Sequence, residues 1–154
     1  MADPFSIAAT ATGLAVTIVK VSKDVEHFMR QVREARREMD AVCRELGSLR
    51  SALEMLAGDM DAPGVAVPQT LEDILSNCEE VLGQLESCLK KYNSERLNTR
   101  VKYVWSGKET VAGYRAALAA HKGALDLAID VMTLSVLYSS PDRTSTKSAN
   151  RHSP

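Results

Sequence analysis

Residues 4–19 form a run in which no side chain is charged. Asp3 and Pro4 predict a helix start here, because Asp accepts hydrogen bonds from free backbone N–H groups and proline suits the first helical position. At about 1.5 Å per residue the run measures about 24 Å, which is shorter than the roughly 30 Å hydrocarbon core of a bilayer. We therefore expect a buried bundle helix at rest, with membrane insertion left open for an activated state. The side chains that would enter a membrane are Phe5, Ile7, Leu14, Val16, Ile18 and Val19.

A second apolar pattern follows, with positions three and four residues apart and no interruption. This spacing predicts one long amphipathic helix with a single buried face. Gly58 and Pro63 lie beyond the pattern and predict the end of that helix and a loop. The positions of the stripe are Val25, Phe28, Val32, Ala35, Met39, Val42, Leu46, Leu49, Leu53 and Leu56.

A third helix is predicted to begin at Thr70, a good N-cap residue that is followed by Glu72 and Asp73 in the first turn. Its apolar residues again step by three and four as far as Tyr92. Further leucines widen this stripe, so we expect the helix to contact two neighbours.

A last long helix is predicted over residues 108–138, and it has two apolar faces. One face carries bulky side chains, among them Leu118, Leu125 and Met132. The other is a row of small residues, which permits close approach of a second helix. We predict that this row packs against Gly13 and its neighbours in the first helix. The small residues are Gly113, Ala117, Ala120, Ala124 and Ala128.

The predicted fold is therefore all-α, a bundle of four main helices. A short fifth helix is expected around Val101, Val104 and Trp105. We assign residues 1–138 to the bundle. Residues 139–154 are rich in serine and nearly free of apolar side chains, so we expect a disordered tail.

Composition narrows the class of protein. The formal net charge is −1, so there is no electrostatic argument for a nucleic-acid partner. The three cysteines have no metal-ligand spacing, and no basic segment of a secretory signal precedes the apolar run. We expect a cytoplasmic protein with reduced, buried thiols, peripheral at a membrane at most.

Candidate chemistry is sparse along the chain. His27, His121 and His152 are far apart in sequence, and no motif combines them with a nucleophile or an orienting carboxylate. No glycine-rich phosphate loop, Cys-x-x-Cys or His-Glu-x-x-His occurs. We expect a protein that is not an enzyme and that uses no cofactor and no metal.

One segment combines basic and aromatic residues. Such a segment can lie on an anionic membrane, where Trp and Tyr favour the interface. Alternatively, Trp105 anchors a short helix in the core while the basic side chains stay in water, and this interpretation is favoured because the patch is small. The residues are Lys90, Lys91, Arg96, Arg100, Lys102, Tyr103 and Trp105.

The opening Met-Ala-Asp-Pro-Phe-Ser-Ile-Ala, the apolar helix after it and the long stripe resemble a fungal N-terminal domain family. The later part of the chain agrees with it through Trp105, Leu118, His121, Lys122, Leu125 and Leu127. This family stands at the front of STAND-type NTPases, is described as the N-terminal domain of the azaphilone pigment biosynthesis cluster protein L, and is related to HeLo-like domains. The resemblance covers residues 1–138 and implies a helical effector or interaction domain without catalytic residues.

Three functions stay open at this point. The first is an interaction or signalling module that docks a protein partner or self-associates. The second is a membrane-permeabilising effector, since the resemblance implies that HeLo-like executioners release an apolar N-terminal helix, here residues 4–19. The third, an accessory role in a secondary-metabolite cluster, rests on the resemblance alone. We expect a protein partner or self-association, with a membrane as partner only on activation.

Overall fold

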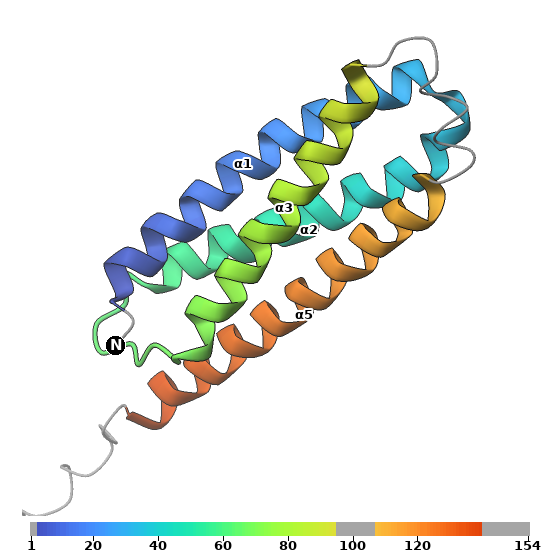
Figure 1. The fold of residues 1–154 in the computed structure, drawn as a ribbon. Coiled ribbons are helices and arrows are strands. Elements are labelled where there is room, and N and C mark those ends of the chain that lie inside the picture. Colours follow the sequence, from blue (N-terminus) through green and yellow to red (C-terminus); the bar gives the residue numbers. More distant parts are fainter. Residues whose placement is uncertain (1–2, 95–106, 140–154) are drawn as a thin grey trace, which may run out of the picture.

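The computed structural model describes residues 3–94 and 107–139, and the described part is an all-α bundle of four long helices (Figure 1). These are α1 (Pro4–Gln31), α2 (Arg36–Asp59), α3 (Thr70–Ser94) and α5 (Lys108–Ser139), with a single 3₁₀ turn η1 (Arg33–Ala35) between α1 and α2. The predicted all-α bundle is thus confirmed. The short helix expected around Val101 lies outside the described residues, as does the tail expected over residues 139–154 except for Ser139, which is the last residue of α5.

Helix α1 begins at Pro4, as the sequence predicts. The Asp3 carboxylate accepts a hydrogen bond from the Ser6 backbone N–H at 3.0 Å, and Pro4 occupies the first turn. The helix continues well past the uncharged run and ends at Gln31. Its second half is charged on the outside and apolar on the inside, as expected for a helix on the surface of a bundle.

The prediction that the stripe from Val25 to Leu56 lies on one helix is wrong, because it is divided between α1 and α2. The backbone of Val32 is extended, with φ −124° and ψ 92°, and the η1 turn reverses the chain direction there. Every position of the predicted stripe is nevertheless buried. A three-and-four spacing specifies which side of a helix faces the core, and both arms of a helical hairpin face the same core. No glycine or proline marks the corner, so the pattern runs through it without a break.

The four helices form a quadrilateral. α1 packs on α2 and α3, and α5 also packs on α2 and α3, so α1 lies diagonally opposite α5 and α2 opposite α3. α1 and α3 run in one direction and α2 and α5 in the other (Figure 1). The connection over residues 60–69 therefore joins helices across the end of the bundle. Gly64 has a φ of +80° within it, a conformation that favours glycine.

The predicted contact between the first and last helices is wrong, because these helices occupy opposite corners. Gly13, Gly113 and Ala120 are exposed, and a Cβ atom added at either glycine would meet no neighbour within 4 Å. Ala117 and Ala124 are half-buried beside the core. The physical reason is that large side chains gain more from burial than small ones. The bulky face of α5 therefore faces the core, and the small-residue row does not form a packing groove for α1, although Ala128 at its end is buried.

Candidate interaction surface

The outer side of α5 carries most of the large apolar side chains that the described part of the protein leaves exposed. Five of the eight such residues lie in the last three turns of α5 or just before them, and Tyr138 is 87% exposed. Single exposed apolar residues are normal on protein surfaces, but contiguous ones mark interaction sites. The five residues are Leu127, Val131, Leu134, Leu137 and Tyr138.

Four of these residues, all except Leu137, belong to a continuous row that we call the outer stripe. Successive members are three or four residues apart, close to the 3.6 residues of a helical turn, so the row follows one side of the helix. That side lies opposite the buried Leu118, Leu125 and Met132. All members are exposed. They are Ala116, Ala120, Gly123, Leu127, Val131, Leu134 and Tyr138.

Sequence analysis missed the outer stripe. Residues 116–138 are apolar nearly all round, and such a helix is normally buried on every side. The predicted bulky face and small-residue row account for two sides of α5, and neither of them includes Leu127, Val131 or Leu134. The signal was available, because Leu127, Val131, Leu134 and Tyr138 themselves repeat at spacings of four, three and four.

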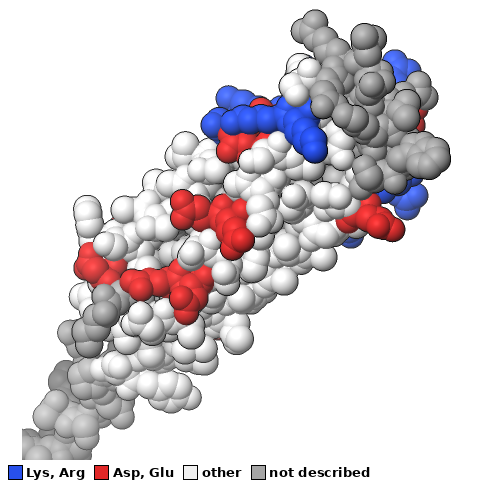
Figure 2. All heavy atoms as spheres, viewed as in Figure 1, with Lys and Arg blue, Asp and Glu red and all other residues white. Residues whose placement is uncertain are grey.

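Charges lie beside the outer stripe and not in it. The Lys122 ammonium donates to the Asp126 carboxylate at 2.9 Å, and this hydrogen bond raises the pKa of Lys122. Asp130 is exposed one position before Val131. In Figure 2 the visible surface along α5 is uncharged over most of its length. The stripe is therefore suited to an apolar contact with few ionic groups.

A shallow hollow adjoins the stripe where α5 meets the connection between α2 and α3. Its volume is about 170 Å³, and it is lined by the apolar residues Ala62, Val65, Met132, Val136 and Leu137 together with the polar residues Asp59 and Thr133. Small-molecule sites measure about 300–1,000 Å³. The hollow is therefore better suited to one or two side chains of a protein partner than to a small molecule.

The membrane-insertion candidates of α1 divide into two groups. Ile7, Leu14 and Ile18 point into the core, whereas Phe5 and Val16 are exposed. Val19 is half-buried. Within the described residues, α1 is the helix that is long and apolar enough to cross a membrane, and only a third of its most apolar window is buried. A core helix of a soluble protein passes the same test.

The basic and aromatic segment is described only at its beginning. Lys90 and Lys91 are exposed at the end of α3, and the Lys90 ammonium lies 3.0 Å from the Glu86 carboxylate. The other members lie outside the described residues. They are Arg96, Arg100, Lys102, Tyr103 and Trp105.

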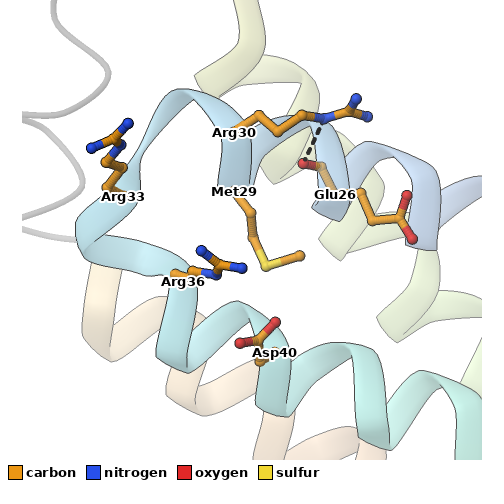
Figure 3. A pocket seen from close by; sticks show the side chains of 6 residues that line it. All are labelled: Glu26, Met29, Arg30, Arg33, Arg36 and Asp40. Carbon is orange, nitrogen blue, oxygen red and sulfur yellow. Dashed lines mark hydrogen bonds between the residues drawn. The ribbon is translucent and has the colours of Figure 1, made fainter.

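A second charged region surrounds the corner between α1 and α2. Arg30, Arg33 and Arg36 line an open hollow of about 490 Å³ together with acidic residues. Their guanidinium groups point in different directions, and the Met29 thioether lies between them (Figure 3). The Arg30 side chain donates to the Glu26 carbonyl oxygen at 3.4 Å. These side chains do not converge on one point, as recognition of an anion would require.

The three thiols are poor nucleophiles in this fold. Burial raises the pKa of Cys78 to about 11 and also raises the pKa values of Cys43 and Cys88. The thiolate is the reactive form, so these side chains react slowly near neutral pH. Among residues 3–94 and 107–139, no cluster of three His, Cys, Asp or Glu side chains is placed to hold a metal ion.

Comparison with known proteins identifies a family that covers nearly the whole chain. The family model described as pigment biosynthesis cluster protein PigL N-terminal covers residues 2–145, nearly the whole chain. No curated protein and no solved structure matches the chain. The matched span includes all four helices and the outer stripe. This chain therefore belongs to the family of PigL N-terminal domains, as its opening residues and helical pattern led us to expect.

Proposed function

We propose that this domain is a non-catalytic interaction module that binds a protein partner through the outer stripe of α5. The observation that supports this proposal is the exposed apolar surface of α5. Taking about 200 Å² for a complete large side chain, the five exposed α5 residues present roughly 600 Å². That is the upper end of the range found for the largest patch on a monomer, and such patches are often functional.

The side chains of the described core support the non-catalytic part of this proposal. Catalytic acids, bases and nucleophiles need pKa values suited to their task. Here burial moves the pKa values of the thiols away from neutrality. The domain would then act as the N-terminal modules of STAND-type receptors do, by docking and not by chemistry.

A pair of matched variants tests the proposal. Leu127 on α5 is 65% exposed and Met55 on α2 is 60% exposed, so a glutamate at either position costs the fold equally little. We expect Leu127→Glu to lose the partner that the wild-type protein retains, and Met55→Glu to keep it. The partner is captured on immobilised protein, identified by mass spectrometry, purified and titrated against all three proteins. Equal affinity of that purified partner for all three would contradict the proposal.

A second candidate function is membrane permeabilisation by α1, favoured by its length and by the small buried share of its apolar window. The domain would then be cytoplasmic, and contact with an anionic membrane would itself release α1. Val16 is 66% exposed, so Val16→Glu leaves the core intact while adding a charge to the inserting segment. Leakage of vesicles of phosphatidylcholine and phosphatidylserine should occur with wild-type protein and vanish with V16E. An intact dye content with both proteins would reject this function.

The family description also suggests an accessory role in the biosynthesis of a pigment or another secondary metabolite. A docking module fits such a role, because it can bring together enzymes without catalysing a step itself. Deletion of the gene, followed by metabolite profiling, should reduce one product. Complementation with L127E instead of wild type should fail to restore that product if the stripe carries the role.

A further inference from the structure

We infer that the occupant of the outer stripe is a second copy of this chain, packed with its α5 antiparallel to the first and centred on Leu127. This inference rests on the proposed interaction role of the stripe and names its partner. Every stripe residue is exposed, so the described part of the protein can form the contact without rearrangement.

The spacing of the stripe is symmetric about Leu127. From Leu127 the members lie four, seven and eleven positions away in both directions. Two antiparallel helices related by a two-fold axis at Leu127 therefore place each stripe residue opposite another stripe residue. Such a contact uses the same patch on both subunits, which is the commonest arrangement of homodimers. The pairs are Leu127 with Leu127, Gly123 with Val131, Ala120 with Leu134, and Ala116 with Tyr138.

The paired residues are also complementary in size. One half of the stripe is made of Ala116, Ala120 and Gly123, and the other half of Val131, Leu134 and Tyr138. The antiparallel arrangement puts a small residue opposite each large one except Leu127, which meets its own copy at the two-fold axis; alternation of small and large residues is how packed layers interdigitate. A parallel arrangement would set large against large at one end and small against small at the other, leaving a bulge and a gap.

The available area agrees with a dimer contact. The large side chains of the stripe and Leu137 present roughly 600 Å², and a standard interface buries about 800 Å² on each partner. The small half of the stripe supplies the remaining contact.

The charged residues beside the outer stripe favour a protein over a lipid bilayer as the occupant of the stripe. Helices that lie on membranes carry Lys and Arg on their polar side. Here the charged side chains within residues 116–138 are Lys122, Asp126 and Asp130, and Lys122 is already paired with Asp126. A border whose lysine is already paired offers little attraction to anionic lipids.

The same arrangement has one unfavourable element. The Asp130 carboxylates of the two copies fall on the same flank, about 9 Å apart along the common axis. At physiological ionic strength the screening length is about 8 Å, so some repulsion persists. Asp130→Asn should therefore bind its own copy severalfold more tightly than wild type, an effect that damage to the fold would not produce.

Oligomeric state is measured by sedimentation equilibrium of the full chain, whose monomer mass is 16.8 kDa. We expect wild-type protein to show twice that mass at micromolar concentration. Leu127→Glu places two like charges on the two-fold axis and should weaken the dimer at least tenfold, whereas Met55→Glu should not. Circular dichroism confirms that both variants are folded. A wild-type monomer at all concentrations overturns the dimer, and if L127E still loses its captured partner the proposed function survives that result.

Cysteine cross-linking tests the direction of the helices. Ala120→Cys and Leu134→Cys are made separately and oxidised mildly, with wild-type protein as the background for the native thiols. In the antiparallel dimer residue 120 faces residue 134, so neither variant should cross-link alone and the mixture should yield a covalent dimer. Cross-linking of each variant with itself would overturn the antiparallel arrangement, since a disulfide needs Cα atoms within about 7 Å.

Discussion

The two phenylalanines of this chain show how far location decides the contribution of a residue. Phe28 is fully buried at the end of α1, where its ring lies 5.6 Å from that of Tyr92 on α3, tilted by 47°. Phe5 begins the same helix and is 81% exposed. The pair therefore offers the same substitution in two opposite environments.

Phe28→Ala should lower the free energy of unfolding by about 3–5 kcal/mol, because it removes a buried ring and leaves a cavity. Phe5→Ala should change it by less than about 0.5 kcal/mol, as exposed positions usually do. Urea denaturation followed by circular dichroism measures both. A loss of comparable size for the two variants would show that Phe5 is covered in solution.

Two glycines provide a second matched pair at the residue scale. Gly64 has a φ of +80°, whereas Gly83 lies within α3, and a Cβ atom would meet no neighbour at either position. Gly64→Ala should cost about 1 kcal/mol through backbone strain, and Gly83→Ala should stabilise the helix by about 0.5–1 kcal/mol. Thermal unfolding measures whether each substitution lowers or raises the stability of the protein. Stabilisation by both alanines would mean that the loop backbone tolerates a side chain there.

At the scale of elements, an ionic cluster joins α1 to α3. The Lys20 ammonium lies 2.8 Å from the Glu86 carboxylate, which also accepts from Lys90. The hydrogen bond from Lys20, and then that from Lys90, lowers the pKa of Glu86, and the same bond raises the pKa of Lys20.

Because the pKa of Glu86 is lowered in the folded protein, its contribution to stability depends on pH. A carboxyl whose pKa is lowered by folding stabilises the protein above its unfolded pKa, and this contribution is lost as pH falls through the folded value. Glu86→Gln should therefore lower the melting temperature slightly at pH 7 and not at about pH 2. Glu79→Gln, at an exposed glutamate of the same helix, serves as the control. A difference that persists in acid would show that the glutamine perturbs packing and not charge.

At the scale of the whole molecule, burial of Cys78 links thiol chemistry to global stability. Cys78 lies inside the bundle, and burial raises its pKa from 9.0 to about 11. Near neutral pH this lowers its thiolate fraction about a hundredfold, since each unit is a factor of ten. Reaction with an aqueous reagent thus requires opening of the bundle.

In a variant with serine at Cys43 and Cys88, the rate of Cys78 labelling should rise with urea in parallel with the population of unfolded protein. Labelling under fast opening and closing follows the free energy of unfolding. The measurement uses an aromatic disulfide reagent at several urea concentrations. Rapid labelling without urea would reveal a local opening of α3 that the packed core does not suggest.

Local chemistry and periodicity are enough to predict most of the elements. The Asp3–Pro4 start, the Thr70 start and the end near Gly58 follow from capping and turn preferences that act within a few residues. The burial of the stripe from Val25 to Leu56 follows from its spacing. These features are encoded by residues close together in the chain, so they can be predicted from a single sequence.

Tertiary structure alone decides the rest. The corner at Val32 has no glycine or proline, and it exists because folding α2 back on α1 buries both arms of one stripe. The quadrilateral order puts α1 opposite α5, so Gly13 and Gly113 never meet. The outer stripe is apolar by sequence but exposed by position, because in the described part of the bundle α5 packs mainly on two helices, α2 and α3. Periodicity can tell which residues share a side of a helix, while the number of helices packed around it determines whether that side is left for a partner.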